Sequence, residues 1–441
     1  METHSSLENQ PSLAQRPLSA QDVRTLGLAA LGGALEFYDF IIFVFFTAVI
    51  GELFFPADTP EWLRQLQAFG LFAAGYLVRP LGGIVMAHFG DRGGRKRMFA
   101  LSVFMMAVPT LLIGSLPTYA TAGYAAPLLL LLMRMMQGAA VGGEVPGAWV
   151  FVSEHVPERR VGLACGILTA GLTFGILLGS LMATAINVLY TPAQVKDFAW
   201  RIPFLVGGVF GFFAVYLRRW LAETPVFEQM RQRKALVQGL PLKEVLRGHG
   251  TGVGVSMLIT WLLTAAIVVV ILMTPTLMQK LHGIAPALAL RANSLATLSL
   301  TLGAVLFGLA VDRFGAGWAL AAGSLLLSVT TYLLYVGVGA RPEHLAPLYV
   351  LAGLGAGVVG VVPSVMVRAF PAPVRFSGLS FSYNMAYAIF GGVTPLVVTL
   401  MIQVSPLAPA HYVAALGAVG LAVALYLLTA GRERFASMRA S

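Results

Sequence analysis

Long apolar runs separated by short polar segments recur along the whole chain. Twelve of them have the length needed to cross a bilayer, about 20 residues. They lie near residues 26–50, 66–88, 98–117, 125–151, 162–189, 202–221, 251–276, 290–311, 317–338, 346–367, 376–402 and 410–430. Runs this long indicate helices and not barrel strands, because lipid requires each backbone polar group to be satisfied within its own segment. The pattern predicts an all-α polytopic membrane protein with twelve transmembrane helices.

A long polar segment divides the apolar runs into two sets of six. We expect a tail at 1–23, six-helix bundles at 24–221 and 250–431, a partly helical central loop at 222–249, and a second tail at 432–441. A weak repeat supports this division, because Gly90-Asp91-Arg92 follows the second run and Val311-Asp312-Arg313 follows the eighth. Two parallel six-helix halves place a binding site between them, near the bilayer midplane.

Basic residues predict the orientation in the membrane. Most of the 29 Lys and Arg residues fall in segments on the side of both termini, which are therefore expected to be cytoplasmic. The opposite side carries only Arg64, Lys196, Lys280, Arg291 and Arg341. The net charge of +10 thus indicates basic cytoplasmic loops and not nucleic-acid binding, since 58% of residues are hydrophobic and only 11% charged. The single cysteine, Cys165, excludes a disulfide within the chain and gives no metal cluster.

Two carboxylates lie in the middle of the first apolar run. Glu36 and Asp39 are three residues apart, so a helix places them on one face. A charged carboxylate near the bilayer centre costs on the order of 3 kcal/mol, and such residues face a protein interior or a wet cavity where a partner meets them. Glu36 and Asp39 are therefore the candidate proton-carrying groups.

Two arginines within the apolar runs are the candidate partners. At about 1.5 Å per residue, Asp39 and Arg134 lie roughly 16 and 14 Å from the outer surface, while Glu36 and Arg79 both lie roughly 21 Å deep. Depth matching predicts the pairs Asp39–Arg134 and Glu36–Arg79, with the crossed pairs left open. Such pairs either lock the helices together or are switchable, when a proton or an anionic substrate competes for the arginine.

The second half contains no Asp or Glu inside an apolar run. Its polar residues either hold helices together or line a cavity, and Asn384 with Tyr387, one turn apart, is the pair expected to line one. Glu144, beside Pro146, either joins the cytoplasmic charges or titrates. The remaining candidate substrate contacts are Tyr38, Gln137, Trp261 and Asn293.

Several motifs together resemble the major facilitator superfamily, and within it the metabolite:proton symporters, which carry citrate, α-ketoglutarate, dicarboxylates, shikimate, proline or betaine. The motifs are Glu36-Phe37-Tyr38-Asp39-Phe40, Phe54-Phe55-Pro56, Arg79-Pro80-Leu81-Gly82-Gly83, Gly90-Asp91-Arg92-Gly93-Gly94-Arg95-Lys96, Arg134-Met135-Met136-Gln137-Gly138, Val141-Gly142-Gly143-Glu144, Trp200-Arg201-Ile202-Pro203-Phe204, Glu223-Thr224-Pro225, and Phe370-Pro371 with Arg375, Gly378, Asn384 and Phe390-Gly391-Gly392.

This resemblance implies alternating access of two rocking halves, driven by a proton gradient, in a monomer of the bacterial inner membrane. It also places Asp39 and Arg134 at positions that act in proton coupling in related carriers. The segment from Asp91 to Lys96 matches a cytoplasmic gate motif, in which Asp91 meets a helix N-terminus of the other half. The residues expected at this gate are Asp91, Arg92, Arg95, Lys96, Glu144 and Glu154, with Arg92 and Arg95 binding acidic groups such as Glu154.

Four positions depart from the family pattern. Ala87 replaces the leading Gly of the gate motif, Gly315-Ala316-Gly317 replaces Gly-Arg-Arg in the second copy, and Arg368 replaces an acidic residue. The usual Gly-Glu-Tyr-Gly-Gly of the fourth run is Gly143-Glu144-Val145-Pro146-Gly147. We expect a weaker or rewired latch in the second half.

The two buried arginines favour a proton-coupled importer of a small organic anion, a mono-, di- or tricarboxylate, because Arg binds carboxylate bidentately. Protonation of Asp39 or Glu36 would free Arg134 or Arg79 for the substrate. The alternatives are a symporter of a zwitterion such as a betaine or amino acid, and an exporter or exchanger.

An enzyme is not expected, since His88, His155 and Cys165 form no catalytic or metal-binding motif. Besides the proton gradient no cofactor is expected, and the partners are the substrate, protons and the lipid bilayer.

Overall fold

Helices make up every regular element of the computed structural model, which describes residues 17–218, 220, 223–232 and 241–431. The first half contains α1 (Ala20–Phe45), α2 (Thr47–Phe54), α3 (Glu61–Gly93), α4 (Arg95–Ser115), α5 (Tyr119–Ala122), α6 (Ala125–His155), α7 (Val161–Leu189), α8 (Pro192–Gln194) and α9 (Arg201–Arg218). Short helices α10 (Pro225–Gln232) and α11 (Pro241–Gly248) follow in the central loop, as predicted for that segment; residues 233–240 lie outside the description.

The second half begins at Gly250, and several of its helices change pitch within a span. Its α-helices are α12 (Gly250–Thr264), α13 (Thr274–His282), α14 (Pro286–Phe314), α15 (Ala316–Ala340), α16 (Leu345–Ala356), α17 (Val362–Arg368), α18 (Arg375–Ala386), α19 (Gly392–Ile402) and α20 (Ala408–Leu428). Four short 3-10 helices are η1 (Glu158–Arg160), η4 (Pro342–His344), η5 (Gly357–Gly360) and η6 (Ala372–Val374). Three π-helical segments are η2 (Val195–Ala199), η3 (Ala265–Met273) and η7 (Tyr387–Gly391).

Each of the twelve predicted apolar runs coincides with a helix or with a broken helix. Within the described ranges, ten helices have the length and composition to cross a membrane, and a bent pair, Pro192–Ala199 with Arg201–Leu217, makes eleven. The second run is carried by α3, which is 33 residues long. The all-α prediction is therefore confirmed.

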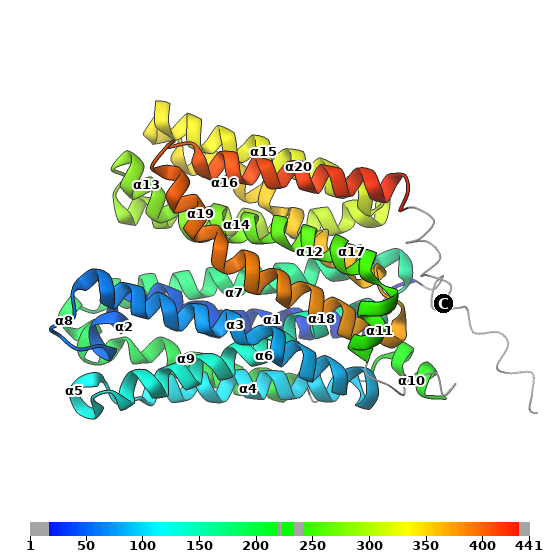
Figure 1. Ribbon diagram of the computed structural model, residues 1–441, viewed down its shortest axis with the longest axis horizontal. Coiled ribbons are helices and arrows are strands. Elements are labelled where there is room, and N and C mark those ends of the chain that lie inside the picture. The colour runs from blue at the N-terminus through cyan, green and yellow to red at the C-terminus, as the bar shows by residue number, and fades with distance from the viewer. Residues whose placement is uncertain (1–16, 219, 221–222, 233–240, 432–441) are drawn as a thin grey trace, which may run out of the picture.

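The two halves lie one above the other in Figure 1, with α1 to α9 below and most of the second half above; α18 lies at the level of α3. Helix α7 of the first half packs against α14 of the second. Hydroxyl contacts join this pair at two levels, between Thr173 and Thr301 (Oγ1 to Oγ1, 3.0 Å) and between Ser180 and Ser294 (Oγ to Oγ, 3.5 Å). Helices α7 and α14 thus form one continuous contact between the halves.

Helix α18 is the part of the second half that enters the first. It packs against α3 and α6, and most of its residues are buried, whereas α19 packs against α20 and η3 of its own half. Between α18 and α19 the chain forms the π-helical segment η7. The chain in Figure 1 leans away from α3 after this break. Residues on α18 and η7 are therefore placed where the halves meet.

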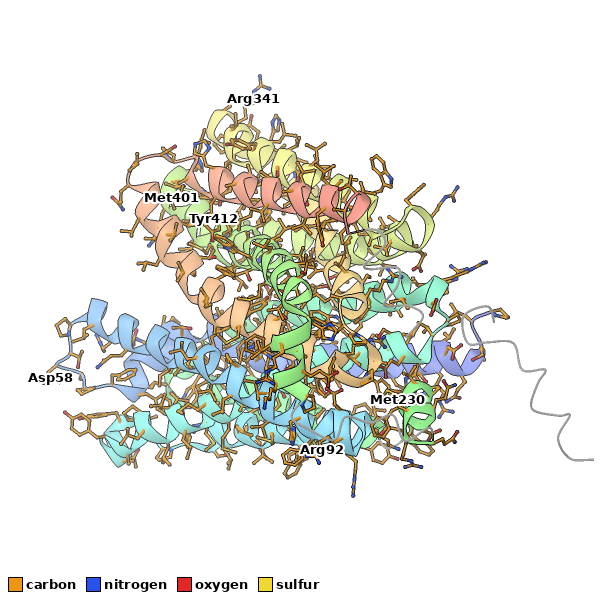
Figure 2. The ribbon with its side chains drawn as sticks, turned by 45° about the vertical axis from the view of Figure 1, so that its right-hand side comes forward. Asp58, Arg92, Met230, Arg341, Met401 and Tyr412 are labelled. Carbon is orange, nitrogen blue, oxygen red and sulfur yellow. The ribbon has the colours of Figure 1, made fainter. Side chains whose placement is uncertain are left out.

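The two ends of the molecule differ. At one end, which we call the Asp91 end, carboxylates of one half bind backbone and side chains of the other, as described below. At the opposite end the loops of the two halves separate: Asp58, between α2 and α3, and Arg341, after α15, lie far apart in Figure 2. The halves are thus closed against each other at the Asp91 end.

Candidate functional site

Arg79 lies in a cage of three tyrosines between the two halves. Its Cζ is 5.3 Å from the ring centre of Tyr76 on its own helix, 5.4 Å from Tyr383 on α18 and 4.5 Å from Tyr387 on η7. A guanidinium at such distances is attracted to the ring faces by about 0.5–2 kcal/mol per contact. The side chain is 2% exposed, and its Nε and Nη2 have no hydrogen-bond partner among the described residues. This cation keeps donors to offer to an anionic ligand.

Glycines allow α3 and α6 to approach closely enough to form this site. A Cβ on Gly142 of α6 would collide with the backbone oxygen of Arg79 on α3, and one on Gly138 would collide with that of Gly75. Close backbone approach of this kind is a common use of small residues between membrane helices. Arg79 and Arg134 are therefore held on rigid, closely packed helices.

Arg134 begins a short chain of polar contacts inside the first half. Its Nη1 donates to Gln137 Oε1 at 2.8 Å, and Gln137 Nε2 donates to Thr110 Oγ1 at 2.7 Å. The guanidinium also lies over Phe40 and Phe43, with Cζ at 5.0 and 4.2 Å from the ring centres. All three polar side chains of this chain are fully buried. Gln137, expected as a substrate contact, is thus bonded to Arg134 and Thr110 in this conformation.

Asp39 is buried against α9 and makes no hydrogen bond to Arg134. Its side chain is 0% exposed, and neither carboxylate oxygen has a hydrogen-bond partner among the described residues. A Cβ on Gly207 would meet Oδ1 of Asp39 and lie 3.1 Å from Cγ2 of Thr110, and one on Gly211 would lie 3.1 Å from Oδ2. The predicted direct pair of Asp39 with Arg134 is thus not formed in this conformation. Asp39 instead adjoins Thr110, the far end of the polar chain from Arg134.

The predicted pair of Glu36 and Arg79 is not observed either. Glu36 lies on the buried face of α1 with 1% exposure, while Arg79 is enclosed by the tyrosine cage. Depth along a helix was the basis for both pairings. Depth does not determine the direction in which a side chain points around the helix axis.

Aromatic rings connect the surroundings of the two arginines. Phe40 meets Tyr76 edge-on at 5.6 Å, Tyr76 stacks on Tyr387 at 6.0 Å, and Tyr387 lies 4.8 Å from Tyr383. Trp149 of α6 closes this wall against Tyr383 at 5.1 Å. Rings from both halves thus form one surface that leads from Arg134 to Arg79.

Other predicted substrate contacts are used within the protein. Asn384 donates through Nδ2 to the backbone oxygen of Gly142 at 2.6 Å and to Ser380, so it ties α18 to α6 next to Arg79. Asn293 accepts from Tyr349 Oη at 2.6 Å within the second half. Tyr38 donates to the backbone oxygen of Pro203 on α9 at 3.0 Å. Neither Asn293 nor Tyr38 is brought to the arginine site.

Trp261 lies next to the site without joining it. Its ring stacks on Phe390 of η7 at 4.2 Å, and its Nε1 donates to Tyr412 Oη at 2.9 Å. Tyr412 also contacts Thr394 of α19. This group holds the segment that follows Tyr387 against α12 and α20.

Asp91 makes the contact predicted for it, with a helix N-terminus of the other half. Its Oδ2 accepts from the backbone nitrogen of Ser377 at 2.9 Å and from Ser377 Oγ at 2.8 Å, in the first turn of α18. Charge-assisted bonds at a helix N-terminus are favourable. The second copy of the motif does the same: Asp312 accepts from the nitrogens of Gly162 (2.7 Å) and Leu163 (3.0 Å) at the start of α7. The missing basic residues of that copy thus leave its carboxylate contact in place.

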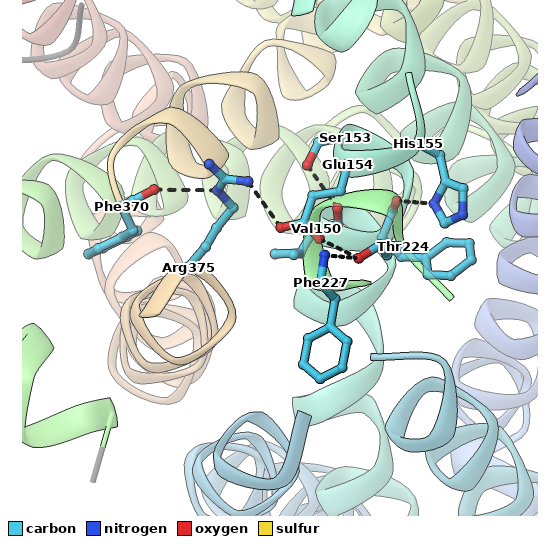
Figure 3. Close-up of polar contacts among 9 residues, drawn as sticks. Val150, Ser153, Glu154, His155, Thr224, Phe227, Phe370 and Arg375 are labelled. Carbon is cyan, nitrogen blue, oxygen red and sulfur yellow. Dashed lines mark hydrogen bonds and ion pairs between the residues drawn. The ribbon is translucent and has the colours of Figure 1, made fainter. Parts of the chain in front are cut away.

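Glu154 joins three segments at the Asp91 end, shown in Figure 3. Its Oε1 pairs with Arg375 Nη1 at 3.0 Å, and its Oε2 accepts from Thr224 Oγ1 at 2.9 Å. The predicted bond from Arg92 to Glu154 is wrong, since Arg92 Nη1 lies 3.4 Å from His88 Nε2. Arg375 of the second half is thus a partner of Glu154.

For the other predicted gate residues, no bond to the opposite half is described. The backbone nitrogen of Lys96 donates to both carboxylate oxygens of Glu223 at 3.2 Å. Glu144 is buried, with 3% exposure, in the middle of α6. The side chain of Arg95 lies outside the described residues. Among the predicted gate residues, Asp91 and Glu154 make bonds between the halves.

Sequence reasoning missed Tyr76, Tyr383, Phe40 and Thr110 as site residues. One signal was available: Tyr76 is three residues from Arg79, and Tyr383 is four from Tyr387, so helical spacing places each pair on one face. Nothing in the sequence shows that these two faces, about 300 residues apart, come together.

A chain with spans of this kind, two six-helix halves and a buried charged site between them has the architecture of a secondary transporter. The family model of the Major Facilitator Superfamily matches residues 28–298, and the chain belongs to this family. Its members are transporters, which confirms that the protein is not an enzyme. The resemblance seen in the sequence is thereby confirmed.

Similar proteins cover almost the whole chain. It is 30% identical over 423 residues to the "Putative proline/betaine transporter" of Staphylococcus aureus (strain COL), covering 93% of this chain and 89% of the relative. It is 34% identical over 423 residues to the "Ectoine/proline transporter ProP" of Corynebacterium glutamicum, covering 92% and 83%. The solved structure of the proton:xylose symporter XylE bound to 6-bromo-6-deoxy-D-glucose has a TM-score of 0.75 at 17% identity, covering 92% of this chain and 95% of that chain. The likeness to XylE shows the shared fold.

Proposed function

We propose that this protein is a proton-coupled symporter of a small zwitterion that carries a carboxylate and a substituted ammonium group, such as proline or a betaine. The observation that carries the proposal is the cage around Arg79. In this cage, the guanidinium of Arg79 offers donors for a carboxylate, and the faces of three tyrosine rings offer a site for a cation. Aromatic faces are the usual site for quaternary ammonium groups.

This proposal replaces the organic anion that the sequence favoured. Two buried arginines fit a carboxylate, but a di- or tricarboxylate has no use for the tyrosine faces. The names of relatives that transport proline, betaine or ectoine support a zwitterion. Of the two substrate classes considered from the sequence, the zwitterion is thus better supported than the organic anion.

Binding would exchange one cation for another. The substrate carboxylate takes the donors of Arg79 and draws its guanidinium off the ring of Tyr387. The ammonium group of the substrate then occupies the ring faces that Arg79 has left. The net charge of the buried site stays the same throughout, so a zwitterion enters without an unpaired charge, whose burial would be costly.

Asp39 would carry the proton. An ionised carboxylate buried with no donor is expensive, so Asp39 would be the neutral acid in this conformation, where its oxygens accept no hydrogen bond from the described residues. When Asp39 loses its proton, its charge attracts Arg134 through the polar chain of Gln137 and Thr110. Arg134 then moves relative to Phe40, which contacts Tyr76 of the substrate cage. Through these contacts the proton and the substrate would act on the same inter-half surface.

The Asp91 end would be the cytoplasmic face of a bacterial inner membrane. In this orientation the bonds of Asp91, Glu154 and Asp312 close the inner side, and the substrate enters from outside. Rocking of the halves would break these bonds and expose the site inward.

Substitution of Tyr387 tests the site. Tyr387→Leu removes one ring face, and we expect the Kd of glycine betaine to rise about tenfold, since one desolvated cation–π contact is worth roughly 1–2 kcal/mol. Tyr387→Phe retains the face and should bind normally. Tyr124→Leu, on an exposed residue, is the matched control. Binding is measured by isothermal titration of the purified protein with glycine betaine, proline and succinate. Tight binding of succinate without binding of either zwitterion would show an organic-anion carrier and contradict the proposal.

A further inference from the structure

An apolar cavity of about 630 Å³ opens at the Asp91 end, between α3 and α11. Its apolar walls come from Ile84, Val85 and Phe89 on α3 and from Leu242 and Leu246 on α11. Val85, Phe89 and Leu246 are about half exposed (48%, 54% and 53%). Helix α11 is held in place by the buried Pro241 and Val245. Packing of α11 thus fixes one wall of the cavity opposite α3 in this conformation.

A second cavity extends this groove along the outer face of α3. It has a volume of about 320 Å³ and shares Val85 and Phe89 with the first. Its other walls include Leu81 on α3 and Leu101 on α4, which are 65% and 43% exposed. From Phe89 to Leu81 the groove runs about 12 Å along the helix. This is most of the roughly 15 Å depth of hydrocarbon in one leaflet of a bilayer.

Basic side chains border the groove where it meets the Asp91 end. Lys243 and Arg247 are one turn apart on α11 and both line the first cavity, as does His88 on α3. Arg92 contacts His88, which places a fourth basic group beside them. The Nδ1 atom of His88 is buried and has no partner among the described residues. The opening thus combines positive charge with an apolar groove that leads into the membrane.

We propose that this groove binds one anionic phospholipid of the cytoplasmic leaflet. An acyl chain lies along Leu242, Val85 and Leu81, and the phosphate of the headgroup meets Lys243, Arg247 and His88. The charge complementarity selects an anionic headgroup. The length of the groove selects a lipid over a soluble phosphate, which would leave the apolar walls empty.

The position of the groove makes the lipid a bridge between the halves. Helix α11 packs against α18 and α12 of the second half, while the opposite wall is α3 of the first. Ser377, which binds Asp91, forms part of the same cavity. A ligand that needs both walls binds only while the Asp91 end is closed, so it stabilises that conformation by mass action. The membrane's anionic lipid content would therefore tune how readily the inner side opens.

Native mass spectrometry of the purified full chain tests the proposal, with phosphatidylglycerol and phosphatidylcholine as probes. We expect one phosphatidylglycerol to bind more tightly than phosphatidylcholine. The double variant Lys243→Gln/Arg247→Gln should weaken it roughly 25-fold, about fivefold for each basic group. Lys280→Gln/Arg341→Gln removes the same charge elsewhere and should bind as the natural protein does. Val85→Trp fills the junction of the cavities and should displace the lipid without a change of charge.

Three results would overturn the proposal. Equal affinity for phosphatidylcholine would remove the role of the basic residues. Unchanged binding in both the double variant and Val85→Trp would place the lipid elsewhere. Competition by glycerol 3-phosphate at the concentration that saturates phosphatidylglycerol would show a site for soluble anions. These measurements record binding alone, so they stand apart from the identity of the transported solute.

Discussion

Ser377→Ala isolates one hydrogen bond that closes the Asp91 end. The substitution removes the hydroxyl that donates to Asp91 Oδ2 at 2.8 Å and keeps the backbone bond at 2.9 Å. A hydrogen bond to a charged group contributes about 1.5–3 kcal/mol. Because about 1.4 kcal/mol corresponds to a tenfold change in an equilibrium constant, the ratio of open to closed molecules at this end should rise at least about tenfold.

Distances between spin labels at Glu158 and Trp318 would measure this ratio. Both residues are exposed at the Asp91 end, one on each half, and the chain's single cysteine, Cys165, is buried and will not be labelled. Ser382→Ala is the matched control, since Ser382 Oγ donates to the backbone oxygen of Gly378 within α18, at 2.7 Å, and to no other group in the described part of the chain. We expect Ser377→Ala to populate a longer distance and Ser382→Ala to leave the distribution unchanged. Equal behaviour of the two variants would refute the reasoning that Asp91 closes this end through Ser377.

Two further substitutions test neighbouring parts of the structure. Gly207→Ala places a methyl group against Asp39 and should lower the free energy of unfolding by about 1–3 kcal/mol, as overpacking does. Gly254→Ala is the control, because a Cβ there meets nothing within 4 Å. Thermal unfolding in detergent compares the two variants, and equal melting temperatures would mean that α9 does not enclose Asp39. Asp312→Asn removes the charge at the start of α7 and should open the Asp91 end in the same label experiment; an unchanged distribution would mean that this second carboxylate does not hold the halves.

The fold could be predicted from the sequence because the length of each apolar run is a local property of the chain. Twelve apolar runs specify twelve spans, and the polar segment between Ala222 and His249 separates the halves whatever the packing. The contact of Asp91 with an α18 N-terminus was also predictable, since its motif is local and its partner, a helix start, is a general feature. The membrane imposes these regularities on any sequence that crosses it.

The site was only partly predictable because it depends on rotation about helix axes and on contacts between distant segments. Arg79 and Arg134 were identified correctly as buried cations, since charge inside an apolar run is conspicuous. The two pairs predicted from depth, Asp39–Arg134 and Glu36–Arg79, were not: the structure surrounds Arg79 with Tyr76 and Tyr387 and bonds Arg134 to Gln137. A tyrosine within an apolar run gives no comparable signal.

Uptake driven by an imposed pH gradient tests the central claim most directly. Proteoliposomes containing the natural protein or Asp39→Asn would be given an inward proton gradient and radiolabelled glycine betaine or proline. The natural protein should accumulate the solute and lose accumulation when a protonophore is added. Asp39→Asn, which cannot release a proton, should fail to accumulate it but still exchange internal for external solute. Full accumulation by Asp39→Asn with an unchanged dependence on the gradient would contradict the account.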